Sequence, residues 1–241
     1  MSNLNVRRDF PARAPSGAVD LTASQGGRRI APAAEGSIGP RLALLRGAFD
    51  PPHIAPLVAA GEAIRTLALD RVLLLVEKHP APRRDAMGAS AADRLAMVAA
   101  CVAGTSGLEA SSIEIDRAGE PNAAIVVDEV VAAANPACLF LLMGSDTAGQ
   151  LRTWCGIDAV KARACLAVWP REGLPLRDLP GWQIRHLDVP RLQISGAALR
   201  ARVAAGRPID WLVPAPAVCI ISELGLYRGS TSMPMTASQR S

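Results

Sequence analysis

The chain of 241 residues is half hydrophobic but only 3% aromatic, and 26 basic against 22 acidic residues leave a net charge of +4. This length suits one larger domain or two small ones, and the apolar content excludes a chain that is disordered throughout. No apolar run approaches the ~20 residues that a membrane helix needs, and residues 1–40 contain no apolar segment of the kind found in secretory signals.

Residues 1–40 and 228–241 show no hydrophobic period, so we expect two disordered tails around a folded domain at residues 41–227. Inside that domain, apolar runs alternate with helical patterns. In chain order we expect a strand at Leu42–Leu45, a helix at Pro56–Leu69, a strand at Val72–Val76, a helix at Ser90–Val102 with a capping-box-like start, a strand at Ser112–Ile115 and a helix at Ala123–Ala134. A strand at Cys138–Met143, one helix or two short ones broken near Gly156 within Ala148–Arg163, strands at Ala164–Trp169 and Ile184–Leu187, and helices at Gly196–Ala205 and Pro216–Leu224 follow.

The strands are continuous apolar runs, which is typical of a sheet that is covered on both faces. Their alternation with helices predicts an α/β fold: a Rossmann-like parallel sheet with helices on both faces. In such sheets a ligand binds beyond the carboxyl ends of the strands, at the point where the strand order reverses. We therefore expect the chemistry in the residues that follow Leu45, Val76, Met143 and Leu187.

The five cysteines form no CxxC pair, and their spacing fits neither a zinc site nor a disulfide framework. We therefore expect no protein-bound metal and a reducing, cytoplasmic compartment. The small positive charge is compatible with a phosphorylated substrate, with weak nucleic-acid binding or with neither.

The segment from Arg46 to Pro56 follows the first expected strand and opens a helix. Gly47 and Ala48 are small enough to let a ligand approach the backbone, and a helix start offers free N–H groups to a phosphate. His53 stands where a ring N–H could reach a phosphate oxygen. The alternative is an ordinary strand-to-helix loop stiffened by two prolines.

This segment resembles the first loop, GGTFDPPHxGH, of the nicotinate mononucleotide adenylyltransferases in the HxGH nucleotidyltransferase superfamily. The match covers Gly47, Phe49, Asp50, Pro51, Pro52 and His53. Other signatures of that family follow in order, at Leu69–Val72, Asp93–Met97, Met143–Asp146 with Trp154, Ile194–Arg200, Trp211–Pro214 and Gly225–Tyr227. The resemblance spans Arg41 to Tyr227 and implies the nucleotidyltransferase α/β phosphodiesterase type of fold.

The chain departs from the family pattern at Arg46, Ala48, Ala55, Pro56, Gly196 and Ala197. Pro56 stands in place of the second histidine of HxGH, the family's main catalytic contact to phosphate. Proline has neither a side-chain donor nor a backbone N–H, although it suits the first turn of a helix. The chain therefore resembles a divergent member with a degraded HxGH motif.

The resemblance implies catalytic roles for His53 and Arg200, nucleotide binding by Gly47, Ala48, Phe49, Gly144, Asp146 and Ser195, and acceptor binding by Lys78, His79, Arg83 and Trp154. Each has an alternative. Asp146 could accept ribose hydroxyls or cap a helix, and Trp154 could face a base or pack internally. Arg200 could neutralise phosphate charge or lie on a solvated helix face. The basic loop at residues 78–84 could bind phosphate or could simply be exposed to solvent.

The activity implied is AMP transfer from ATP to nicotinate mononucleotide, which gives deamido-NAD and pyrophosphate, with Mg²⁺ accompanying ATP. The implied partners are ATP and a pyridine mononucleotide, without nucleic acid or a membrane. Two alternatives remain: a catalytically impaired nucleotide-binding protein, or a nucleotidyltransferase with a different acceptor.

Overall fold

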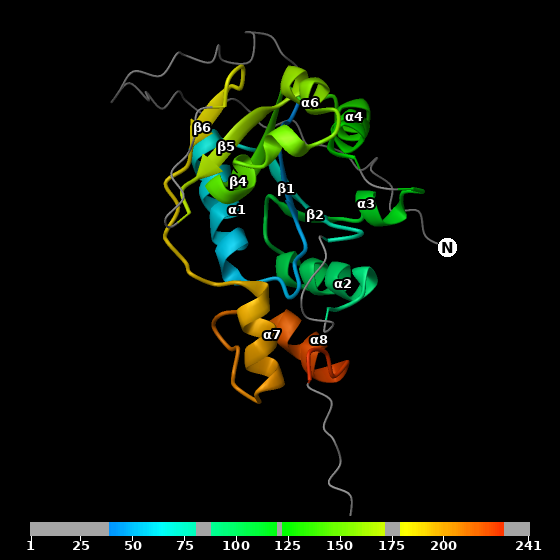
Figure 1. The fold of residues 1–241 in the computed structure, drawn as a ribbon, viewed down its shortest axis with the longest axis vertical. Coiled ribbons are helices and arrows are strands. Elements are labelled where there is room, and N and C mark those ends of the chain that lie inside the picture. The colour runs from blue at the N-terminus through cyan, green and yellow to red at the C-terminus, as the bar shows by residue number, and fades with distance from the viewer. Residues whose placement is uncertain (1–38, 81–87, 120–121, 172–178, 229–241) are drawn as a thin grey trace, which may run out of the picture. The chain divides into compact units, whose positions relative to one another are not determined.

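A computed structural model describes residues 39–80, 88–119, 122–171 and 179–228. The two expected tails lie almost wholly outside these ranges, as does Arg83 of the expected basic loop. Within the described part of the chain, six parallel strands form one sheet in the order β3-β2-β1-β4-β5-β6 (Figure 1). The strands are β1 Arg41–Gly47, β2 Arg71–Val76, β3 Leu108–Ser111, β4 Cys138–Gly144, β5 Cys165–Trp169 and β6 Ile184–His186.

Helices cover both faces of this sheet, so the expected Rossmann-like fold is confirmed. On β1, Ala43 and Leu45 pack into a core with α1 (Ile54–Leu67) and α2 (Ala91–Val102). The alternate residues Leu42 and Leu44 pack into a second core with the helices of the opposite face, which are α4 (Ala123–Ala134), α5 (Ser145–Ala148) and α6 (Ile157–Arg163). Side chains alternate across a strand, and here both sets are apolar because both faces are covered.

A third apolar cluster joins the end of the chain to α2. Met97 of α2 packs with Leu199 of α7 (Gly196–Ala204), with Ile221 of α8 (Ala215–Glu223) and with Tyr227. Figure 1 shows α7 and α8 together beside α2. The last two helices are thereby held close to the segment that follows β1. No helix in the described ranges is long and apolar enough to cross a membrane.

Local sequence signals explain most element boundaries. The helix expected from Pro56 begins two residues earlier, at Ile54, because proline is compatible with the first turn. Ser90 caps α2 as its sequence predicts, with its hydroxyl accepting the Asp93 N–H at 3.1 Å. Gly156, with φ of +71°, separates α6 from α5 and a short 3-10 helix at Leu151–Thr153. Of the two alternatives for that region, short broken helices are therefore correct.

The strand expected at Ser112–Ile115 is wrong. The edge strand is Leu108–Ser111, which pairs with Val72–Leu75 of β2. The following residues form a single helical turn, α3 (Ile113–Asp116), in which the Ile115 N–H donates to the Ser112 carbonyl. The two isoleucines therefore reach opposite cores from a turn, since Ile113 packs on one face of the sheet and Ile115 on the other.

Candidate active site

A cavity of about 690 Å³ opens at the carboxyl ends of β1 and β4. These strands are neighbours in the sheet, and the chain order reverses between them, which is where α/β sheets bind ligands. Gly47 ends β1 and Gly144 ends β4, and both line the cavity. The start of α1 and the segment leading into α7 complete its walls.

The loop after β1 is held by Asp50, whose side chain is only 3% exposed. Its Oδ1 accepts the Ala89 N–H at 3.1 Å and the Tyr227 hydroxyl at 2.5 Å. One residue earlier, Phe49 is buried with a φ of +48°. The buried Arg94 of α2 donates to the Ala48 carbonyl at 2.7 Å. The shape of this loop is therefore fixed by contacts from α2 and from the end of the chain.

Arg200 belongs to the same set of contacts. Its guanidinium is buried, donates to the Asp50 carbonyl at 2.6 Å and lies 3.7 Å from Asp50 Oδ2. The close approach of α7 requires Gly196, because a Cβ there would lie 2.6 Å from the Asp50 carbonyl oxygen. Arg200 lines the cavity, but its charge is largely committed to Asp50.

His53 precedes α1 and lines the cavity next to this loop. Its Nδ1 is buried and makes no hydrogen bond to any described residue. Burial, followed by the positive charge of Arg171, lowers the pKa of His53 to about 4. The ring is therefore neutral near pH 7, when it can donate one N–H and accept one hydrogen bond.

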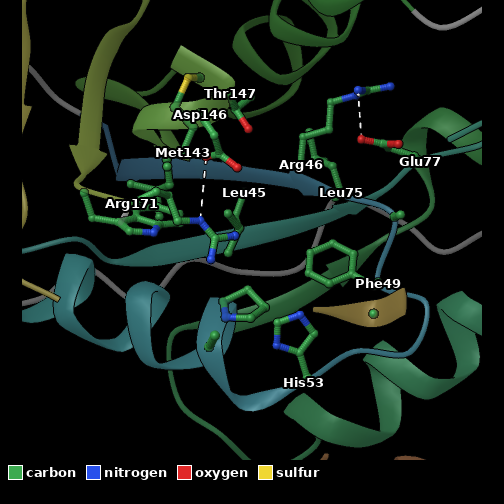
Figure 2. Close-up of a pocket in the computed structure, with 18 of the residues that line it drawn as sticks. Leu45, Arg46, Phe49, His53, Leu75, Glu77, Met143, Asp146, Thr147 and Arg171 are labelled. Atoms are coloured by element: carbon green, nitrogen blue, oxygen red, sulfur yellow. Dashed lines mark hydrogen bonds and ion pairs between the residues drawn. The ribbon is translucent and has the colours of Figure 1, made fainter. Parts of the chain in front are cut away.

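Asp146 and Arg171 form the opposite wall, beyond the ends of β4 and β5. The Arg171 Nε lies 3.7 Å from Asp146 Oδ1, and the Arg171 backbone N–H donates to the Ser145 hydroxyl at 2.8 Å. Gly144 leaves room for both side chains, since a Cβ there would meet Asp146 Oδ1 at 2.4 Å and Arg171 at 3.1 Å. Figure 2 shows the Arg171 guanidinium between Asp146 and His53.

A third group, Arg46 with Glu77 and Glu114, lines the cavity at the ends of β1 and β2. Arg46 binds Glu114 through two hydrogen bonds of 2.6 and 3.0 Å, and it binds Glu77 at 3.0 Å (Figure 2). Burial alone would lower the pKa of Arg46, but the two glutamates raise it overall. For Glu77, burial raises the pKa, and the nearby charge of Arg46 opposes that shift. In this triad one guanidinium faces two carboxyl groups, so Arg46 is engaged within the protein.

The structure brings eight of the twelve predicted site residues to this cavity: Gly47, Ala48, Phe49, His53, Gly144, Asp146, Trp154 and Arg200. Three others do not line it. The Lys78 ammonium donates to the Arg117 carbonyl, His79 is exposed, and the Ser195 hydroxyl accepts the Ala198 N–H at 3.2 Å as the cap of α7. The twelfth, Arg83, lies outside the described residues.

Sequence reasoning did not find Arg171 or the Arg46–Glu77–Glu114 triad. Arg171 follows β5 by two residues, so the rule that selected the ends of the other strands would have included it. Glu114 falls in the segment expected as a strand. In the structure it belongs to the helical turn α3, and its carboxylate accepts a hydrogen bond from Arg46.

A parallel sheet with an arginine-containing cavity at its switch point is the arrangement in which Rossmann-like α/β proteins bind ligands. The cytidylyltransferase-like family model matches residues 44–202. The chain is 35% identical to a protein of Gemmatimonas aurantiaca named "Probable nicotinate-nucleotide adenylyltransferase", over 78% of this chain and 92% of that protein. It is 33% identical to a protein of the same name from Bordetella avium, over 78% and 98%. The chain therefore belongs to the cytidylyltransferase-like family and, within it, to the nicotinate-nucleotide adenylyltransferases.

Solved structures agree on the fold. The nicotinic acid mononucleotide adenylyltransferase of Plasmodium falciparum complexed with NaAD superposes with a TM-score of 0.64, covering 78% of this chain and 97% of that one. The same enzyme complexed with APC gives a TM-score of 0.63. At 13% and 12% identity, these likenesses establish the fold alone.

Proposed function

We propose that the protein transfers AMP from ATP to nicotinate mononucleotide, giving deamido-NAD and pyrophosphate, in the cytoplasm. The observation that carries the proposal is the cavity at the switch point, in a chain that matches relatives named for this reaction over nearly their full length. A free thiol at all five cysteines agrees with a reducing compartment.

The proposed roles follow from position in the cavity. The backbone at Gly47 and Ala48 receives phosphate together with Ala55 at the start of α1, because the Ile54 N–H donates to the Leu212 carbonyl and Pro56 has no N–H. His53 donates a ring N–H to the same phosphate. Asp146 accepts ribose hydroxyls beside Gly144, and Trp154 faces a base. Arg200 acts as a positioning residue through Asp50. No role is assigned to Lys78, His79 and Ser195, which do not line the cavity, or to Arg83, which lies outside the described residues.

Mg²⁺ enters this proposal with ATP. Magnesium usually keeps several waters and is held by one or two carboxylates together with substrate phosphates. The described residues contain no group of three or more His, Cys, Asp or Glu that could hold a metal, while Asp146 offers one carboxylate to the cavity. The residues therefore fit an ion that the phosphates carry in, where it would neutralise part of their charge.

A protein that only binds nucleotides is not favoured, because named relatives match over 92% and 98% of their own lengths. His53, Gly144 and Asp146 still line the cavity despite the proline at position 56. These observations favour a working transferase.

The test is pyrophosphate release by the purified full chain with Mg·ATP and either nicotinate or nicotinamide mononucleotide. We expect release that depends on nicotinate mononucleotide, with the dinucleotide formed in equal amount. Silence with both acceptors would overturn the proposal. Preference for the nicotinamide form would overturn the acceptor assignment alone.

A matched histidine pair tests the role of the cavity. His53→Asn should lower kcat by about 10²–10³, the usual cost of removing one donor aimed at developing charge. His186→Asn changes an exposed histidine on β6 and should leave the rate unchanged. Equal rates for the two variants would contradict the role of His53.

A further inference from the structure

The cavity receives a polyanion in the proposed reaction, so the state of its cations decides how that charge is met. Among the described residues, four arginines line it: Arg46, Arg171, Arg191 and Arg200. Arg46 is bound to two carboxylates within 3.0 Å, and Arg200 is buried against Asp50. Arg191 is exposed on the segment before α7. Arg46 and Arg200 are therefore paired within the protein, whereas Arg191 is an exposed residue of the cavity rim.

Arg171 differs from the others in its contacts. Its Nε is buried without a hydrogen bond to any residue in the described ranges, and its ion pair with Asp146 is 3.7 Å long. That separation exceeds the range of an N–H···O hydrogen bond, so the buried Nε makes no hydrogen bond to a described residue, while the side chain as a whole is 40% exposed. The backbone of Arg171 is nevertheless fixed, because its N–H donates to the Ser145 hydroxyl at 2.8 Å.

The direction of the Arg171 side chain also matters. Its charge is close enough to His53 to contribute to the lowered pKa of that ring, and Figure 2 shows its guanidinium on the His53 side of Asp146. Pro56, on the first turn of α1, lines the same cavity and has no donor to offer. The neutral His53 and a residue without a donor, Pro56, therefore line the same cavity as the arginine.

We propose that Arg171 is a catalytic residue of the AMP transfer, whose guanidinium binds the α-phosphate of ATP in the cavity that His53 and Pro56 also line. This assignment rests on the proposed function. A guanidinium keeps its charge at every pH of interest and presents paired N–H groups to phosphate oxygens. Asp146 accepts ribose hydroxyls in the same complex and leaves the guanidinium free for phosphate.

In the reaction step, an oxygen of the nicotinate mononucleotide phosphate forms a bond to the α-phosphorus. The bond from that phosphorus to the oxygen bridging to the β-phosphorus breaks, and its electron pair leaves with pyrophosphate. Arg171 exchanges no proton. It stabilises the charge that spreads over the equatorial oxygens, which is the main task of a protein in phosphoryl transfer.

The first experiment compares Arg171→Met with Arg163→Met in the full chain. Arg163 is the matched control, because it is half exposed and has one aspartate partner, Asp128 at 3.1 Å, away from the cavity. We expect Arg171→Met to lower kcat by about 10²–10³ with a much smaller change in KM for ATP, while the control stays within about twofold of wild type. Arg171→Lys should keep part of the rate, since it retains the charge but loses the fork.

The second experiment places a donor opposite the arginine. Pro56→His should raise kcat about tenfold in the Arg171→Met background and much less in the wild-type background, because two donors that serve one phosphate are not additive. A merely structural role for Arg171 would not produce this rescue. Thermal unfolding of each variant confirms that folded proteins are compared.

The outcomes separate the two proposals. If wild type releases pyrophosphate and Arg171→Met stays within about threefold of its kcat, the assignment of Arg171 is overturned and the proposed function stands. An increase in KM with unchanged kcat, or an equal effect of Pro56→His in both backgrounds, also overturns the assignment. A wild-type protein that is silent with both mononucleotides overturns the proposed function and the assignment with it.

Discussion

The two walls of the cavity differ in how their charges are satisfied. On the wall formed by the loop after β1, Asp50 receives a backbone N–H, a hydroxyl and a guanidinium, and it is 3% exposed. On the wall beyond β4 and β5, the pair of Asp146 and Arg171 has the same 3.7 Å separation as the pair of Asp50 and Arg200, but its two side chains are each 40% exposed instead of 1% and 5%.

This difference suggests that one wall maintains the geometry of the cavity and that the other can bind a ligand. Buried polar groups with all their partners hold a unique geometry, and removing one partner is costly. Groups whose contacts are partly exposed exchange those contacts for a ligand at lower cost. An arginine in a nucleotide cavity is therefore judged by what it already binds: Arg200 maintains the wall, whereas Arg171 remains available.

The largest expected effect comes from breaking the closed wall at Asp50. Asp50→Ala leaves the buried Arg200 without its carboxylate and should lower the free energy of unfolding by about 3–5 kcal/mol. Asp158→Ala removes an exposed partner of Lys161 and should cost less than about 1 kcal/mol. Urea unfolding measures both, and similar values for the two variants would contradict the comparison.

Tyr227→Phe removes a single donor from the same carboxylate. Because the lost hydrogen bond is to a charged group, we expect a cost of about 1.5–3 kcal/mol. In the Asp50→Ala background the same change should cost far less, since the acceptor is already gone. Additive costs in this double-mutant cycle would show that the hydroxyl acts elsewhere.

Two glycines allow a direct test of rigid against adaptable walls. A methyl group at Gly196 would meet the Asp50 carbonyl at 2.6 Å, so Gly196→Ala should cost about 1–3 kcal/mol of stability. At Gly144 the methyl group would meet the side chains of Asp146 and Arg171, which can move. Gly144→Ala should therefore lower activity with little change in the unfolding curve. The reverse pattern would contradict the assignment of the two walls.

The smallest effect at neutral pH concerns His53. Its pKa is about 4 in the folded chain against ~6.5 for an unfolded histidine, so the unfolded chain binds more protons between these values. Stability should fall as the pH drops from about 6.5 to about 4 and should not depend on this group above pH 7.

Urea unfolding at pH 7 and pH 5 checks this expectation. His53→Asn should reduce the loss of stability between the two values, while the exposed His186→Asn should not. An undiminished loss in His53→Asn would contradict a neutral, buried His53.

Most of the fold could be predicted because the central strands β1, β2, β4 and β5 are largely apolar runs with helix patterns beside them. The error at Ser112–Ile115 arose because two isoleucines separated by a single residue fit a strand or a helical turn equally well. What decided it was the register with β2, where Ser111 is the last paired residue opposite Leu75. That register is a long-range property that a local pattern does not contain.

The candidate site was predictable where it lies next to a strand end, as at Gly47, His53, Gly144 and Asp146. The role of Arg200 could not be read from its motif, because the Asp50 carbonyl that binds it lies 150 residues earlier in the chain. Lys78 was expected at the acceptor, yet its ammonium donates to the Arg117 carbonyl. In both cases the motif gave the correct residue type near the site, while the contact depended on tertiary packing.

The hydrogen bond from Tyr227 to Asp50 spans 177 residues. During synthesis, the loop after β1 emerges from the ribosome long before the tyrosine that completes it. Nascent chains stalled before residue 227 should therefore contain most of the sheet, while the loop after β1 is only loosely formed. The contact between Tyr227 and Asp50 closes a very long stretch of chain, so it is among the last to form. We therefore expect the cavity to bind nucleotide only once Tyr227 has been synthesised and has reached Asp50.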